Sequence, residues 1–188
     1  MSNMIFNNKI TKILELFRED YNRRIYGRDI ANKLKMNQKT ISNILNRLEK
    51  EDILKFSTEG KNKYYYLNKI NPHIKDIIKL IEIDRKIKFI DNYKKFSSLF
   101  NKLEEKTEGI LIVFGSYANS SANNKSDLDI VIIGKISDIT ELEDLYKIKI
   151  NIVKIDKNKF NKEDILIKEI IRNHIILKKV EEFIELIW

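Results

Sequence analysis

The chain has 188 residues, no cysteine, two histidines and a formal net charge of +8. The absence of cysteine excludes a disulfide framework, a thiolate zinc site and a cysteine nucleophile together. The sequence contains no run of about eighteen apolar residues that would predict a membrane span. Its first residues do not have the pattern of a secretory signal. We therefore expect a cytoplasmic protein without a membrane partner.

The positive charge is concentrated near the N-terminus. Residues 1–70 contain 15 Lys and Arg against 8 Asp and Glu, whereas residues 71–188 contain 21 against 20. A compact basic segment favours a polyanionic partner such as nucleic acid over a surface that is charged only for solubility.

The first seventy residues have the pattern of three helices followed by a hairpin. Apolar residues at helical spacing predict helices near 10–17, over 28–35 and over 38–50. Two β-type runs around a glycine-containing turn predict the hairpin. The polar face of the third helix and the hairpin tip carry the candidate DNA-binding side chains Gln38, Lys39, Ser42, Asn43, Asn46, Arg47, Lys61 and Lys63.

This order of elements resembles the winged helix-turn-helix fold over roughly residues 7–68. The resemblance implies that helix 38–50 reads base edges of double-stranded DNA and that the hairpin contacts phosphates as a wing. Winged domains also serve as protein–protein modules, and that alternative stays open.

The only proline follows Asn71 and marks a boundary. From there to Lys106, apolar residues keep helical spacing for longer than a usual globular helix. The pattern predicts either one long connecting helix or two helices broken near 91–98. The apolar stripe of this 71–106 segment can pair with a second copy in a homodimer, or it can pack on its own domains.

A central segment carries the residues suited to chemistry. Ile110–Phe114 is a wholly apolar run typical of a buried strand, and Gly115 and Ser116 end it. In the next strand, the period of two puts Asp127 and Asp129 on one face. Adjacent carboxylates repel each other unless a cation neutralises them. Oxygen ligands favour Mg²⁺, which binds through carboxylates together with substrate phosphates.

The whole pattern over 110–133 resembles the nucleotidyltransferase superfamily of the DNA polymerase beta type. It is similar above all to the small, minimal nucleotidyltransferases of bacteria and archaea. The resemblance implies that Gly115 and Ser116 bind the phosphates of a nucleoside triphosphate. It also implies that Asp127 and Asp129 are catalytic residues and metal ligands.

The family pattern includes a third carboxylate on the following strand, which is predicted here over 147–155. That carboxylate completes the metal site and acts as general base. The corresponding position in this chain holds Asn151. An amide can ligate magnesium weakly but cannot accept a proton. Asp156 is the nearest other acid, at an offset that faces the other side of a regular strand.

Together these patterns predict an α+β protein with three parts. They are a winged helix-turn-helix DNA-binding domain at 1–70, a connecting helical segment at 71–106, and a nucleotidyltransferase domain with a small mixed β-sheet at 107–188. The predicted function is magnesium-dependent transfer of a nucleoside monophosphate to an acceptor that the sequence does not identify. The alternative is a DNA-binding transcriptional regulator whose nucleotidyltransferase fold is inactive or only senses nucleotide.

Overall fold

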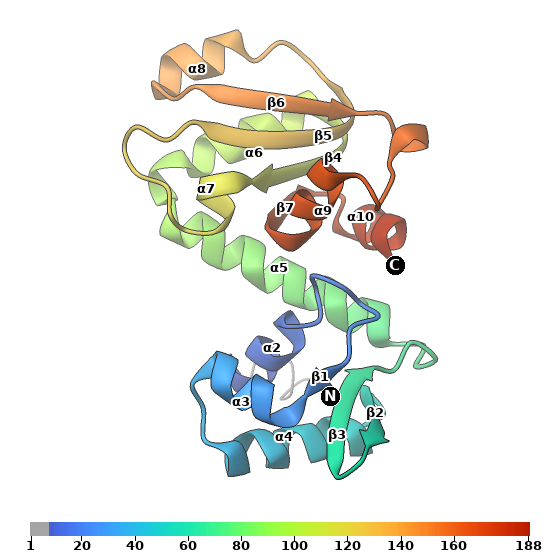
Figure 1. Ribbon diagram of the computed structural model, residues 1–188. Coiled ribbons are helices and arrows are strands. Elements are labelled where there is room, and N and C mark those ends of the chain that lie inside the picture. The colour runs from blue at the N-terminus through green and yellow to red at the C-terminus, as the bar shows by residue number, and fades with distance from the viewer. Residues whose placement is uncertain (1–7) are drawn as a thin grey trace. The chain divides into compact units, whose positions relative to one another are not determined.

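The computed structural model describes residues 8–188, and residues 1–7, the start of the predicted DNA-binding domain, lie outside the described residues. The chain divides into two compact units (Figure 1). The first unit ends at Ile81 and the second unit spans Glu82–Trp188. Within residues 8–188, no helix is both long and apolar enough to cross a membrane.

The first unit combines helices with a three-stranded antiparallel sheet of order β1-β3-β2. Asn37 caps the third of these helices, because its Oδ1 accepts a hydrogen bond from the backbone N of Lys39 at 2.8 Å. The helices and the hairpin lie where the sequence predicts them. The elements are α2 (Asn8–Glu15), β1 (Ile25–Tyr26), α3 (Gly27–Leu34), α4 (Gln38–Lys50), β2 (Leu54–Glu59) and β3 (Asn62–Leu67).

The segment that follows consists of two α-helices rather than one. The break falls inside the interval 91–98 that the sequence indicated, where the side chain of Phe96 turns into the core and is 8% exposed. Asn71 precedes the first helix and accepts a hydrogen bond from the backbone N of His73 at 2.8 Å. The elements are α5 (Ile74–Asn92), the 3₁₀ turn η1 (Lys94–Phe96) and α6 (Ser97–Lys106).

The second unit is built on a mixed four-stranded sheet of order β6-β5-β4-β7. The central strand β4 is antiparallel to β5 and β7, whereas β5 and β6 run parallel. A small mixed sheet in this part of the chain agrees with the predicted α+β class. The elements are β4 (Thr107–Phe114), α7 (Gly115–Ala118), β5 (Leu128–Ile136), α8 (Thr140–Tyr146), β6 (Ile150–Ile155), η2 (Lys157–Lys159), α9 (Ile165–Arg172), β7 (His174–Lys178) and α10 (Val180–Ile187).

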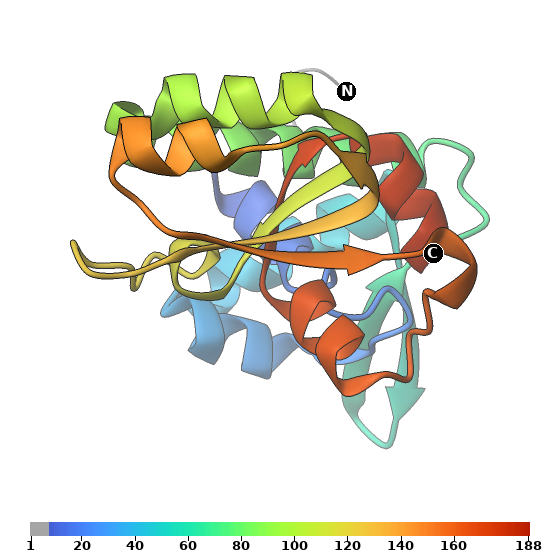
Figure 2. The ribbon, with the colours of Figure 1, turned by 90° about the horizontal axis from the view of Figure 1, so that it is seen from above.

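The sheet of the second unit is covered on both faces. Helices α6 and α8 lie on one face and α9 on the other (Figure 2). Leu128 and Ile130 of β5 point into the core beneath α6 and α8 and are fully buried. Because side chains alternate along a strand, the same arrangement turns Asp129 toward the opposite face, where it is only half-buried.

Candidate functional site

Two aspartates and an asparagine meet at the start of the parallel pair β5–β6. The register of the two strands places Asp129 opposite Asn151. The Nδ2 of Asn151 donates to Oδ1 of Asp129 at 2.9 Å and lies 3.4 Å from Oδ2 of Asp127. The structure therefore brings Asp127, Asp129 and Asn151 together, and the position beside both carboxylates holds an amide.

Gly115 lies directly against this group. Strand β4 pairs Phe114 with Asp129, so the turn that ends β4 adjoins the carboxylate. Gly115 has a φ of +67°, and a Cβ built on it would lie only 2.6 Å from Oδ2 of Asp129. Any side chain at this position would be strained and would displace the carboxylate, so the pairing of Gly-Ser with Asp-x-Asp has a steric reason.

The turn after Gly115 is fixed from two sides. The carbonyl of Ser116 accepts hydrogen bonds from the backbone N of Ser121 at 2.9 Å and of Ala122 at 3.1 Å. The Nδ2 of Asn173 donates to the carbonyl of Gly115 at 3.1 Å. Sequence reasoning missed Asn173, because it is 58 positions from Gly115 and no local motif marks it.

One of the two carboxylates, that of Asp127, already faces a positive group. Asp127 is 39% exposed, and its Oδ2 lies 3.5 Å from Nζ of Lys149. Lys149 sits just before β6, two residues ahead of Asn151. An ion pair of this exposure contributes at most about 1 kcal/mol. A cation binding here would therefore displace Lys149 at small cost.

The donor set fits magnesium. Carboxylate and amide oxygens are the hard ligands that Mg²⁺ prefers. The oxygen and nitrogen of the Asn151 side-chain amide occupy equivalent positions. Rotating the amide by half a turn would therefore point its oxygen at the site in place of its nitrogen. Among the described residues, no cluster of three or more His, Cys, Asp or Glu side chains could hold a metal. A metal held by Asp127 and Asp129 would then need the amide, water and substrate phosphates to complete its coordination.

The remaining candidate for a third carboxylate lies elsewhere. Asp156 follows the last residue of β6, whereas Asn151 lies near its start. The Oδ1 of Asp156 accepts a hydrogen bond from the backbone N of Asn158 at 2.9 Å and so caps η2. Asp156 therefore has a local structural role at the other end of the strand.

A pocket of about 510 Å³ opens beside Asp127. It is formed by η1, the loop before β5 and the loop between α8 and β6. Tyr117 of α7 also lines it, and burial, together with neighbouring Tyr93 and Asp127, raises the pKa of the Tyr117 phenol above its ordinary value.

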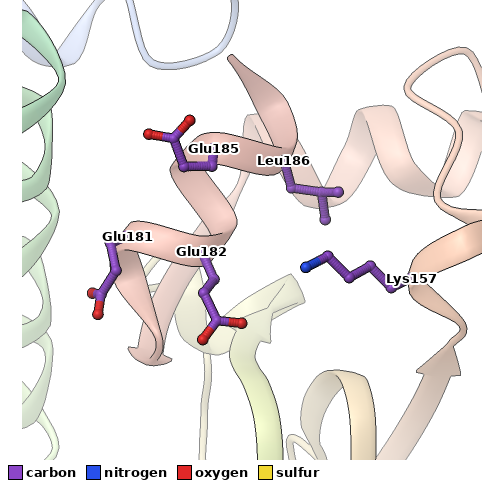
Figure 3. Close-up of a pocket in the computed structure, with 5 residues that line it drawn as sticks. All are labelled: Lys157, Glu181, Glu182, Glu185 and Leu186. Atoms are coloured by element: carbon purple, nitrogen blue, oxygen red, sulfur yellow. The ribbon is translucent and has the colours of Figure 1, made fainter.

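A second hollow, of about 390 Å³, has a different character (Figure 3). Three glutamates of α10 line it together with Lys157 and Leu186: Glu181, Glu182 and Glu185. Glu182 pairs with Lys179 at 2.7 Å, and the hydrogen bond from Lys179 lowers the pKa of the Glu182 carboxyl. The excess of acidic side chains in this hollow repels a triphosphate. Lys157, which lines the hollow, follows the C-terminal end of β6, whereas Asn151 lies near the N-terminal end of the same strand.

The residues predicted to bind DNA lie on the surface of the first unit. All six side chains from α4 are exposed, as are Lys61 and Lys63 near the tip of the β2–β3 hairpin. Nε of Arg47 donates to Oε1 of Glu51 at 2.8 Å, and Nζ of Lys63 lies 3.9 Å from the centroid of the Phe56 ring. Their contact with DNA stays a prediction.

Two solved structures show a weak likeness to about half of this chain. The AntR antimony-specific transcriptional repressor is 19% identical, with a TM-score of 0.40 over 50% of this chain and 76% of that chain. A toxin–antitoxin structure with AMP-PNP is 17% identical, with a TM-score of 0.36 over 51% of this chain and 80% of that chain.

No curated protein matches the chain. Residues 94–186 match the family described as "Nucleotidyltransferase domain". The match includes all four strands of the sheet and the residues Gly115, Ser116, Asp127 and Asp129. This part of the chain is therefore similar to nucleotidyltransferase domains.

Proposed function

We propose that the second unit is a magnesium-dependent nucleotidyltransferase that transfers a nucleoside monophosphate from a nucleoside triphosphate to an acceptor hydroxyl. The observation that carries this proposal is the contact of Asn151 with both Asp127 and Asp129, beside Gly115. It supports a single oxygen-rich site at the start of β5. The nucleotidyltransferase family match supports the reaction class.

Each residue has a distinct role in this proposal. Gly115 and Ser116 bind the triphosphate at the start of α7, and Asp127 and Asp129 hold Mg²⁺ with Asn151 beside them. Magnesium supplies charge neutralisation for an in-line displacement in which pyrophosphate leaves. Because Asn151 cannot accept a proton, the acceptor hydroxyl loses its proton to water, and we expect slow transfer.

The first unit is proposed to be a winged helix-turn-helix domain that binds double-stranded DNA through α4 and the β2–β3 hairpin. The basic excess of residues 1–70 and the exposure of the predicted side chains support this role. A homodimer through the 71–106 segment remains a prediction. Two apolar side chains of α5, Ile83 and Ile87, support it because they are 42% and 56% exposed.

A second function is favoured by the amide at position 151. With no carboxylate there to act as base, the fold can bind a magnesium nucleotide without transferring it. The protein would then be a DNA-binding regulator whose second unit senses nucleotide.

Pyrophosphate release separates the two functions. The protein is incubated with each nucleoside triphosphate and magnesium, and released pyrophosphate and nucleotide affinity are both measured. Release above the level of the protein-free control supports the transferase. Tight binding of magnesium nucleotide without release, over a series of acceptors, supports the regulator.

The first prediction concerns the two carboxylates. Asp127→Asn combined with Asp129→Asn should abolish magnesium-dependent nucleotide binding and leave the fold intact, because only the charges that hold the metal are removed. Calorimetric titration with magnesium nucleotide measures the loss, and circular dichroism checks the fold. Equal affinity in the variant and the parent would refute the proposed site.

A further inference from the structure

The pocket beside Asp127 is rich in lysine. Four lysines line it, and Asp127 is the only acid among the described residues that do so. They come from three separate segments, and all four are exposed: Lys95, Lys125, Lys147 and Lys149. Nζ of Lys149 lies 3.5 Å from Oδ2 of Asp127, and the other three lysines add positive charge to the pocket lining. A ligand of this pocket is therefore expected to carry several negative charges.

The lining of the same pocket also includes apolar side chains. Phe96 forms part of its wall, and Tyr146 is held in place by a hydrogen bond from its hydroxyl to Oγ of Ser98 at 2.8 Å. Leu145 lines the pocket and is 62% exposed, so its side chain is accessible to a ligand. An exposed apolar side chain beside several lysines suits single-stranded nucleic acid, because a base can pack on the apolar side chain while the phosphates meet the cations.

The position of the pocket distinguishes it from the proposed triphosphate site. The described residues that line it include Asp127 but neither Gly115 nor Ser116. Gly115 instead lies against Asp129. In phosphoryl transfer the attacking and leaving oxygens lie roughly in line on opposite sides of the phosphorus. If Gly115 and Ser116 bind the leaving pyrophosphate, as proposed above, a pocket that adjoins Asp127 and includes neither of them is available to the attacking group.

We propose that this pocket binds the acceptor and that the acceptor is the end of a single nucleic-acid strand. The proposal rests on the proposed transferase function. A volume of about 510 Å³ suits a terminal nucleotide. A protein hydroxyl would bring neither consecutive phosphates nor a base, and the four lysines would then have no counterpart.

The proposed step is an extension of the strand by one nucleotide. The terminal hydroxyl oxygen of the strand forms a bond to the α-phosphorus of the nucleoside triphosphate. The bond from that phosphorus to the oxygen bridging to the β-phosphorus breaks, and pyrophosphate leaves with the electron pair. The hydroxyl proton passes to water.

The test uses the full chain and a double variant, Lys125→Gln with Lys147→Gln. Its matched control is Lys135→Gln with Lys154→Gln, two exposed lysines of the same unit that do not line the pocket. The probes are a 5′-fluorescein-labelled single-stranded octaribonucleotide and the octadeoxyribonucleotide of the same sequence. Unlabelled duplex DNA is present in excess to occupy the first unit. Anisotropy reports strand binding, and a fluorescent nucleotide analogue with magnesium reports nucleotide binding.

The expected result is a roughly tenfold weaker strand affinity in the pocket variant, since two phosphate contacts are lost. Nucleotide affinity should be unchanged, and the control variant should resemble the parent in both. With a nucleoside triphosphate and magnesium, the parent should lengthen the strand by one nucleotide on a denaturing gel. Tighter binding of the ribo- or the deoxyribo-strand identifies whether the acceptor is RNA or DNA, and either supports the proposal.

Other outcomes overturn the proposal without touching the proposed function. If the pocket variant loses nucleotide affinity but keeps strand affinity, the pocket belongs to the nucleotide. The parent protein could instead bind nucleotide, release pyrophosphate and become covalently labelled with nucleotide to the same extent with and without the strand. In that case the acceptor is a protein hydroxyl. If the parent binds no magnesium nucleotide at all, the proposed function itself fails.

Discussion

Asn151 sets the charge of the candidate metal site. With Asp127 and Asp129 it forms a group of two charges and one amide, in which the amide nitrogen donates to Oδ1 of Asp129 at 2.9 Å. A carboxylate in the same place would add a third negative charge and a proton acceptor. The residue therefore bears directly on which of the two proposed functions, nucleotide transfer or nucleotide sensing, the unit has.

Asn151→Asp should raise magnesium affinity by about tenfold or more. A unit charge roughly 4 Å from the ion gains several kcal/mol at an effective dielectric constant of about 20, before dehydration is subtracted. Without metal the variant should unfold at lower temperature than the parent, because three carboxylates then repel one another. Thermal unfolding in magnesium and in a chelator measures both effects.

Asn158→Asp, an exposed position in η2, adds the same charge away from the site and serves as its control. A similar change in magnesium affinity in both variants would mean that the added charge acts through the net charge of the protein. Position 151 would then have no special relation to the metal.

Gly115 can be tested against a glycine with similar backbone geometry. Gly60 has a φ of +60°, and a Cβ added to it would have nothing within 4 Å, whereas at Gly115 the carboxylate oxygen of Asp129 would lie 2.6 Å away. Gly60→Ala should cost about 1 kcal/mol of backbone strain. Gly115→Ala should cost more, roughly 2–4 kcal/mol, and weaken nucleotide binding as well. Chemical denaturation and nucleotide titration measure the two effects. Equal stability losses would show that Asp129 yields freely to the added methyl group.

At the scale of elements, helix α5 contacts strand β7 of the sheet and so acts on the site indirectly. Strand β7 is the edge of the sheet, so the outward carbonyls of its backbone need partners from outside the sheet. Arg85 donates to the carbonyl of His174 at 2.6 Å, and Lys86 donates to that of Leu177. Asn173, immediately before β7, then holds the carbonyl of Gly115. The position of the turn at Gly115 therefore depends on how α5 holds β7.

Helix α4 and the β2–β3 hairpin carry the DNA prediction. Lys39→Ala with Arg47→Ala should weaken duplex binding by the full chain several-fold and lower the slope of log affinity against log salt by about 1–2, since each phosphate contact releases counterions. Lys135→Ala with Lys154→Ala, in the second unit, removes the same charge and should change little. Anisotropy titrations over a salt series measure this. An absence of duplex binding by the parent at about 50 mM salt would instead indicate a protein-interaction module.

At the scale of the molecule, buried tyrosines in both units predict a loss of stability at high pH. Burial raises the pKa of Tyr65 in the first unit, and of Tyr93 and Tyr117 in the second, above the ordinary 10.0. Above about pH 10 the unfolded chain therefore loses these protons before the folded chain does. The folded state then binds more protons, so its stability falls as pH rises.

Absorbance of the phenolate at 295 nm follows this titration. Tyr65, Tyr93 and Tyr117 should titrate only above pH 10, together with loss of circular dichroism. Single-phase titration near pH 10 with the fold retained would contradict the effect of burial.

The sequence alone determined the local features of this protein. Period-two alternation placed Asp127 and Asp129 on one face, Asn37 marked the start of α4, and the family pattern pointed to Asn151. These features depend on neighbouring residues and on backbone geometry, which a short stretch of sequence encodes directly.

Only the tertiary structure decided what lies beside these residues. In the structure the 71–106 segment forms two helices, and Phe96 at the break between them is buried in the core. The boundary between the two units lies between Ile81 and Glu82. The side chain of Asn173 reaches the carbonyl of Gly115. The tertiary structure also gathers lysines from three separate segments around one pocket. Contacts of this kind depend on how distant strands and helices pack. The free energy gained by burying apolar surface depends on the whole arrangement, so no single segment of sequence encodes these contacts.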